Sequence, residues 1–255
     1  VMSVITITLG DVAENHVGME KIGDMSEVGS GFNLKDLKSI NKNLKKMGMR
    51  TKLITLKCPD NTQTDGHVLV IKNGVNEILS RHSTFTKEDM FNEQLHVKFD
   101  KKALMRGRVV NKHARWNVCY DTKSKEPDYE NGKGRVVGYT KVPIFKTLFD
   151  NILTYFGAKA SNLKGEGNYY YDITKTGIGY HSDLERRKVI GIRLGENMPL
   201  YFKWYLKGEQ QGDKQEVPLN GGDIYIMSEK AVATDGRKRN IYTLRHATGS
   251  SKYTD

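Results

Sequence analysis

The sequence predicts an α+β protein in which a jelly roll, that is, a double-stranded β-helix with flanking helices, follows a small N-terminal α+β unit. From about residue 168 onward, short β-branched or aromatic runs alternate with Gly, Pro, Asn and charged residues. That pattern is typical of antiparallel sandwiches and barrels. Helix and strand periodicities are mixed in the first part of the chain. We therefore expect an N-terminal unit over residues 1–84 and a jelly-roll domain over residues 85–255.

Composition and cysteine content limit the class of protein. The 255 residues are 37% hydrophobic and 28% charged, ordinary values for a globular chain. Cys58 and Cys119 are the two cysteines and no CxxC occurs, so neither a disulfide framework nor a zinc site is indicated. Without a signal peptide or an apolar run near ~18 residues, we expect no membrane contact. The expected compartment is intracellular and reducing, cytoplasmic or nuclear.

The net charge is strongly positive, at +11. Such a charge favours a polyanionic partner, DNA or RNA, or serves solubility in general. The lysines and arginines are spread along the chain rather than gathered in one run. Charge alone therefore does not identify a substrate, and the sequence carries no signal for an oligomeric state.

The N-terminal unit has clear periodic segments. Residues 3–8 are expected to form a strand, and strands are also expected over residues 50–56 and 67–74. A helix should begin after Asn33 as N-cap and run toward Gly48, since apolar residues recur at helical spacing. His16 is a lone histidine with no partner at metal-ligand spacing, so we expect a structural role for it.

The middle of the chain joins two helices through a basic segment. Thr86 and Asp89 form a capping-box pattern for a helix that should end near Phe99. An amphipathic helix is expected over residues 143–157 and should pack in the core. Between them, Arg115 beside Trp116 supplies a cation and an aromatic ring, which are suited to holding a phosphate and stacking a base. An ordinary solvated loop explains these residues as well.

His181 and Asp183 form an HxD triplet at the end of an expected strand. Side chains two residues apart lie on the same side of a strand, so both can bind one metal ion. A second histidine would complete a two-His, one-carboxylate triad, the arrangement that favours non-haem Fe(II). His246 is the candidate. The alternatives are a solvated turn for the triplet and a strand-end histidine for His246.

Residues 85–250 resemble the Fe(II)/2-oxoglutarate dioxygenases, most closely the AlkB-like nucleic-acid dealkylases. The likeness consists of an amphipathic helix before an NxY-like strand at residues 168–171, a strand ending in HxD, an LG-ended strand and a GD-started strand at residues 222–226. It implies Fe(II) and 2-oxoglutarate as cofactors and hydroxylation of a C–H bond. A hydroxylated N-methyl group would then leave as formaldehyde.

The distal part of the chain departs from the AlkB pattern. Arg239 and Arg245 have the family's Arg-to-Arg spacing, but no histidine lies between Asp223 and Arg239. Either Asp235 or His246 is then the third ligand. In prolyl-hydroxylase-like relatives a lysine follows the distal histidine, as Lys252 does here, which favours His246.

The resemblance also implies which residues contact the cosubstrate and the substrate. Cosubstrate contacts are expected from Tyr171 and from one of three cations, Arg193, Arg245 or Lys252. Arg115, Trp116 and Arg186 are the expected substrate contacts.

Three functions are compatible with these observations. The first is a dioxygenase that oxidises a nucleic-acid base. The second is the same chemistry on a protein side chain, prolyl or lysyl. The third is a jelly-roll binding module without metal.

Overall fold

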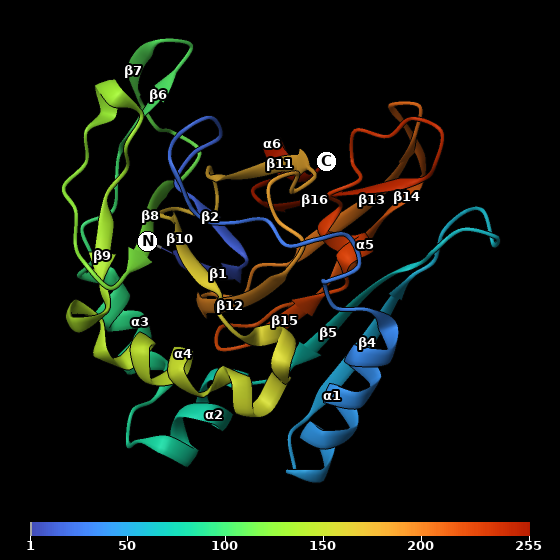
Figure 1. Ribbon diagram of the computed structural model, residues 1–255, viewed down its shortest axis with the longest axis horizontal. Coiled ribbons are helices and arrows are strands. Elements are labelled where there is room, and N and C mark those ends of the chain that lie inside the picture. The colour runs from blue at the N-terminus through green and yellow to red at the C-terminus, as the bar shows by residue number, and fades with distance from the viewer. Residues whose placement is uncertain (1) are drawn as a thin grey trace.

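The computed structural model describes residues 2–255 as a mixed α+β protein with two main sheets (Figure 1). The large sheet has eight strands in the order β4-β5-β15-β12-β1-β10-β8-β9. Its strands, in chain order, are β1 (Val4–Gly10), β4 (Thr51–Leu56), β5 (Gly66–Ile71), β8 (Trp116–Asp121), β9 (Val136–Gly138), β10 (Lys164–Tyr170), β12 (Val189–Gly195) and β15 (Ile224–Met227).

The second sheet has four antiparallel strands in the order β11-β16-β13-β14. They are β11 (Gly177–His181), β13 (Leu200–Leu206), β14 (Glu209–Val217) and β16 (Thr243–Gly249). Two small hairpins complete the strands: β2 (Val12–Glu14) with β3 (Lys21–Gly23), and β6 (Lys102–Met105) with β7 (Arg108–Asn111). The β6–β7 hairpin lies at the upper left of Figure 1.

Four helices pack on one face of the large sheet, where the main apolar core lies. They are α1 (Leu34–Lys46), α2 (Gly74–His82), α3 (Lys87–Leu95) and α4 (Pro143–Phe156). Two short helices, α5 (Glu229–Val232) and α6 (Ser251–Thr254), flank the smaller sheet. Across residues 2–255, no helix combines the length and apolar character needed to cross a membrane.

Local sequence explains where these helices begin. Asn33 caps α1 and Thr86 caps α3, each through a reciprocal capping box with the third helical residue. Pro143 occupies the first turn of α4, where its missing N–H costs nothing. These three helices confirm the predictions, although α3 ends at Leu95 rather than near Phe99. Helix α2 was not predicted.

The expected division at residue 84 does not separate two sheets. Strand β1 lies in the middle of the large sheet, paired antiparallel with β10 on one side and β12 on the other. Strand β5 pairs with β15, so β4 and β5 extend the same sheet. Strands β1 and β5 thus join residues 2–84 to the rest of the chain through hydrogen bonds to strands from beyond residue 160, and the division at residue 84 stays a prediction.

Candidate metal centre and its cavity

A cavity of about 340 Å³ lies between the two sheets. Strand β1 shows how the large sheet provides its floor: Ile5 and Ile7 enter the apolar core, whereas Thr6 and Thr8 face the cavity. This alternation follows from the two-residue repeat of a strand. Pairing between strands aligns one polar row across the floor, formed by Asn117, Asn168, Thr6 and Arg193.

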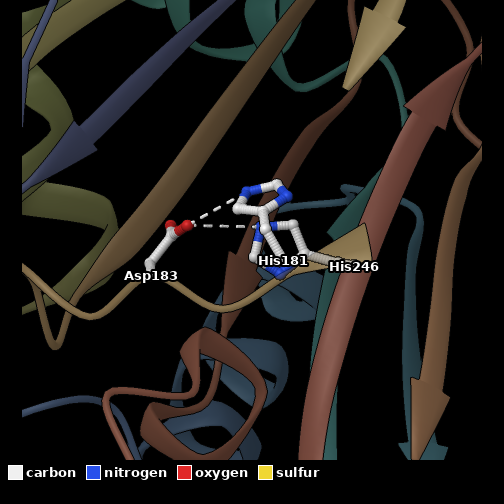
Figure 2. A group of neighbouring side chains, drawn as sticks. All are labelled: His181, Asp183 and His246. Carbon is white, nitrogen blue, oxygen red and sulfur yellow. Dashed lines mark ion pairs between the residues drawn. The ribbon is translucent and has the colours of Figure 1, made fainter. Parts of the chain in front are cut away.

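His181, Asp183 and His246 come together at this cavity, with one potential ligand atom from each lying within 4.8 Å of the others. His181 pairs with His246 across β11 and β16, and the two ring centroids are 4.2 Å apart. One Asp183 carboxylate oxygen lies 3.2 Å from His181 Nε2 and 3.6 Å from His246 Nε2. Figure 2 shows both imidazoles turned toward this oxygen.

Both histidines can offer the lone pair of a ring nitrogen to a metal ion. His181 Nδ1 lies 2.8 Å from the Gly179 carbonyl oxygen. A donated Nδ1–H there leaves Nε2 free for a metal ion. Burial, the neighbouring His181 and Arg186 together lower the pKa of His246 to about 3, although Asp183 acts in the opposite direction. His246 is therefore a neutral imidazole at ordinary pH.

Asp183 is a carboxylate held in place by its loop. Burial opposes its charge, but His246, a hydrogen bond from His181 and nearby Arg186 together hold the pKa of Asp183 below its ordinary value. Its backbone N–H donates to the Val232 carbonyl at 3.0 Å, and Ser182 Oγ donates to the Leu244 carbonyl at 2.8 Å. These two hydrogen bonds hold the chain in place at Asp183 and at the residue before it.

Arg193 is a buried cation on the cavity floor, only 1% exposed. Its guanidinium donates to Thr6 Oγ1 at 2.6 Å and to Thr248 Oγ1 at 3.3 Å, and its Nε has no partner in the described part of the chain. Thr248 follows His246 by two residues on β16, a separation of roughly 7 Å along a strand. No carboxylate of residues 2–255 pairs with Arg193, so this guanidinium is suited to an incoming anion.

Tyr225 lies beside Arg193 because β12 has a glycine at the facing position. A Cβ on Gly191 would come within 2.0 Å of the Tyr225 ring. The missing side chain lets this ring lie across β12, and the Arg193 guanidinium carbon is 6.0 Å from its centroid. Tyr225 thereby forms part of the cavity wall.

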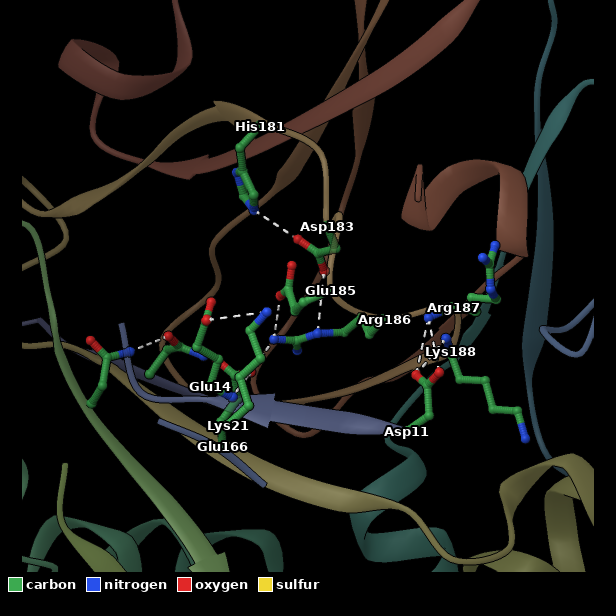
Figure 3. A network of polar contacts seen from close by, with 12 residues as sticks. Asp11, Glu14, Lys21, Glu166, His181, Asp183, Glu185, Arg186, Arg187 and Lys188 are labelled. Atoms are coloured by element: carbon green, nitrogen blue, oxygen red, sulfur yellow. Dashed lines mark hydrogen bonds and ion pairs between the residues drawn. The ribbon is translucent and has the colours of Figure 1, made fainter. Parts of the chain in front are cut away.

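A second charged group, seen in Figure 3, lies beyond Asp183. Arg186 is 4% exposed and donates to Glu166, and at 2.7 Å to Glu185. Its Nε is 4.0 Å from the second Asp183 oxygen. Arg186 therefore links the Asp183 carboxylate to two other acidic residues, and it lines the cavity, where its contact with a substrate stays a prediction.

Of the four predicted cosubstrate residues, Arg193 alone lines the cavity. Tyr171 stacks on Trp116 at 4.2 Å and donates to the His113 carbonyl, while its neighbour Tyr170 faces the cavity. Arg245 lies on the opposite side of β16 from His246 and covers the Tyr205 ring at 3.9 Å. Lys252 is exposed on α6. Strand alternation explains why Tyr171 and Arg245 do not line the cavity. Each is next in sequence to a residue that does, Tyr170 and His246 respectively.

The remaining predicted residues differ in whether they line the cavity. Arg115 lines the cavity, and its buried Nε has no hydrogen-bond partner among residues 2–255. Trp116 does not line it, because its ring is covered by Tyr171 and by Lys101 Nζ, 4.2 Å from the ring centroid. The alternative ligand Asp235 forms an ion pair with Lys230 at 2.8 Å and is not part of the triad.

Several cavity residues were not predicted from the sequence, and His16 was assigned a structural role. Glu14, Asn15 and His16 all line the cavity wall. The pKa of His16 is lowered to about 4 by burial and by neighbouring Lys112 and Arg115. The alternation of polar residues on β1 and β10 was the available signal, since Thr6, Glu166 and Asn168 each interrupt an otherwise apolar or glycine-rich strand.

Two imidazole nitrogens and one carboxylate oxygen, gathered in a cavity between two sheets, define a candidate mononuclear metal centre in a strand-rich α+β protein. The chain belongs to the family of an uncharacterized protein, R156, of Acanthamoeba polyphaga mimivirus. The two are 42% identical over 254 residues, which cover 98% of this chain and 96% of the viral protein. No family model matches the chain.

Proposed function

We propose that this protein is an Fe(II)/2-oxoglutarate-dependent dioxygenase. The observation that carries the proposal is the grouping of His181, Asp183 and His246. Two imidazole nitrogens and one carboxylate from a single side leave further coordination positions open, the arrangement that non-haem Fe(II) oxygenases use. The donor set thus fits Fe(II).

Bound iron would couple oxidation of 2-oxoglutarate by dioxygen to hydroxylation of a substrate C–H bond, with one oxygen atom entering the product alcohol, the other entering succinate, and carbon dioxide leaving. The protein's own part is to hold the reactants. His181, Asp183 and His246 would hold the metal, and Arg193 with Thr6 and Thr248 would bind the far carboxylate of the cosubstrate. A buried guanidinium with only hydroxyl partners gains most from a carboxylate.

The jelly roll is part of the same proposal, and the course of the chain supports it. From β10 to β16 the chain passes back and forth between the large and the small sheet. A jelly roll has eight strands in two sheets. Strand β1, between β10 and β12, would supply the eighth strand. The jelly roll would then be completed by an N-terminal strand and not by a strand that follows β16.

The substrate class has two candidates. Nucleic acid, the first expectation, is supported by the net charge of +11 and by exposed cations at Arg106, Arg108 and residues 237–239. A protein side chain is supported by the cavity wall, where Tyr170 and Tyr225 are each 4% exposed and provide little free aromatic surface for stacking a base.

Iron binding and 2-oxoglutarate turnover test the chemistry. His181→Ala, Asp183→Ala and His246→Ala should each lose Fe(II) binding and turnover, because each removes one of three ligands. Asp235→Ala is the matched control and should keep both. Anaerobic Fe(II) titration followed by absorbance gives the affinity, and succinate release gives the turnover. Full turnover in any ligand variant, or no iron binding by the unaltered protein, would instead support a binding module without metal.

A turnover screen separates the two substrate classes. Succinate release should be measured with single-stranded DNA, with RNA and with peptides, each over the background without substrate. Stimulation by one class together with a mass increase of one oxygen atom, or loss of a methyl group, assigns the substrate to that class.

A further inference from the structure

One wall of the cavity gathers several carboxylates around Arg186 (Figure 3). Glu14 and Glu166 are each 7% exposed, and Glu185 is close to them. Arg186 is the guanidinium within this group, and it donates to Glu166 and Glu185. If Asp183 binds the metal, Arg186 and the half-exposed Lys21 are left with three carboxylates. A buried cluster with unequal charges is costly until a counter-ion joins it.

Glu14 is the least neutralised of the three carboxylates. Its ion-pair partner within residues 2–255 is Lys21, 3.9 Å away and half exposed. Burial and repulsion by Glu185 raise the pKa of Glu14 to about 7. Glu14 therefore has the most to gain from a cation that enters the cavity.

Asn15 provides a second, independent observation. This side chain is 4% exposed and lines the same cavity. Its Nδ2 donates to Asp100 at 2.8 Å, which fixes the orientation of the amide. Its Oδ1 is buried and has no hydrogen-bond partner among residues 2–255. A carbonyl oxygen can only accept, so the missing partner is a hydrogen-bond donor.

We propose that this wall binds an aliphatic ammonium or guanidinium group, as lysine and arginine side chains carry, with Glu14 and Asn15 as its acceptors. Such a group brings both the positive charge and the N–H donors that the wall lacks. Arg193 accepts an anion on the floor and Glu14 a cation on the wall, so the cavity holds oppositely charged ligands at separate places. The inference rests on the proposed function, for which it supplies the substrate class.

Binding can be measured without turnover, in metal-free protein and again with Mn(II). The probes are five-residue alanine peptides with a central lysine or arginine, their neutral counterparts with norleucine or citrulline, and the free ions butylammonium and methylguanidinium. Calorimetry should show tighter binding of the charged peptides than of the neutral ones, by about tenfold or more. Equal binding of the free ions would point to a small cationic substrate, and preference for the peptides would point to a protein residue; both support the site.

Three variants make the test specific. Glu14→Gln should remove the preference for charged peptides, and Glu27→Gln, an exposed carboxylate further along the same segment, should keep it. Lys21→Gln removes the competing cation and should strengthen binding. Because Lys21 is exposed, this variant remains informative if Glu14→Gln fails to fold.

Two results would overturn the inference: equal affinity of the unaltered protein for lysine and norleucine peptides, or an unchanged preference in folded Glu14→Gln. Stimulation of turnover by oligonucleotides alone, without cation binding, would also overturn it. Failure of iron binding while the cation preference persists would instead refute the dioxygenase chemistry and leave the cation site standing.

Discussion

At the scale of single residues, Arg193 is a buried cation in this cavity that is suited to bind an anion. It is buried, it is held by Thr6 and Thr248, and it has no carboxylate partner among residues 2–255. Arg193→Met should therefore weaken 2-oxoglutarate binding by at least about tenfold, since a charge-assisted contact is lost. Iron affinity should change little.

The matched control for Arg193 is Arg245→Met, because Arg245 covers Tyr205 outside the cavity. Cosubstrate affinity is measured by titrating turnover with 2-oxoglutarate, and iron affinity by metal titration of each variant. Equal loss of cosubstrate affinity in both variants would contradict the assignment of Arg193 as the carboxylate partner.

The lowered pKa of His246 predicts that the stability of the metal-free protein depends on pH. Its pKa in the folded state is about 3, against 6.5 ordinarily, so between these values the unfolded state binds the proton more readily. Stability due to a neutral His246 is thus present above about pH 6.5 and is lost as the pH falls toward 3. The loss should approach about 1.4 kcal/mol for each pH unit within that window.

Denaturant unfolding from pH 7 to pH 4, compared with His246→Gln, measures this contribution. The comparison is needed because Glu14, with its pKa raised to about 7, acts in the opposite direction over the same range. Identical pH profiles for the two proteins would refute a buried neutral His246.

At the scale of elements, we expect the rest of the chain to need β1 in order to fold. It separates β10 from β12 and carries Ile5 and Ile7 into the main core. A fragment of residues 85–255 lacks this strand and leaves the hydrogen-bonding edges of β10 and β12 open. We expect the fragment to show no cooperative thermal unfolding and to be cleaved rapidly by proteases.

A single substitution tests the same strand in the full-length chain. Ile7→Ala should lower the free energy of unfolding by about 2–5 kcal/mol, since Ile7 is fully buried. Val28→Ala is the control, because Val28 is 80% exposed, and should change it little. A stable, cooperatively folded fragment would show that β1 is dispensable. So would an Ile7→Ala variant whose free energy of unfolding equals that of the unaltered protein.

At the scale of the whole molecule, the charge of +11 predicts binding of polyanions. Affinity for a single-stranded oligonucleotide should fall with salt, with a slope of log K against log salt of roughly −0.7 for each phosphate neutralised. Arg106 and Arg108 are exposed at the β6–β7 hairpin. Replacing both with Gln should weaken binding to all sequences alike and make the slope shallower.

The control removes the same charge elsewhere. Lys45 and Lys46 lie on α1, on the opposite side of the molecule from the hairpin in Figure 1, and their replacement with Gln should leave the slope closer to that of the unaltered protein. Fluorescence anisotropy at several salt concentrations gives both slopes. Flat salt dependence, or equal effects of the two double variants, would argue against a nucleic-acid surface at the hairpin.

The sequence by itself determined the strand-rich α+β class, the capped helices at Asn33 and Thr86, and the pairing of His181 with Asp183. These features depend on neighbours within a few residues, which periodicity and capping patterns report directly. The HxD triplet could be recognised at the end of an expected strand, although β11 ends at His181 and Asp183 reaches it from the loop that follows rather than from the strand.

The tertiary structure alone decided what the distant parts of the chain contribute. His246 and Arg193 line the cavity and Arg245 does not because of the side of the strand on which each lies, whereas Asp235 and Lys252 are kept away by the loop and the helix that carry them. The place of β1 between β10 and β12, and of Glu14 and Asn15 in the cavity wall, depends on pairing between residues more than 150 positions apart. Local patterns do not encode such pairing, because it is set by the packing of the whole chain.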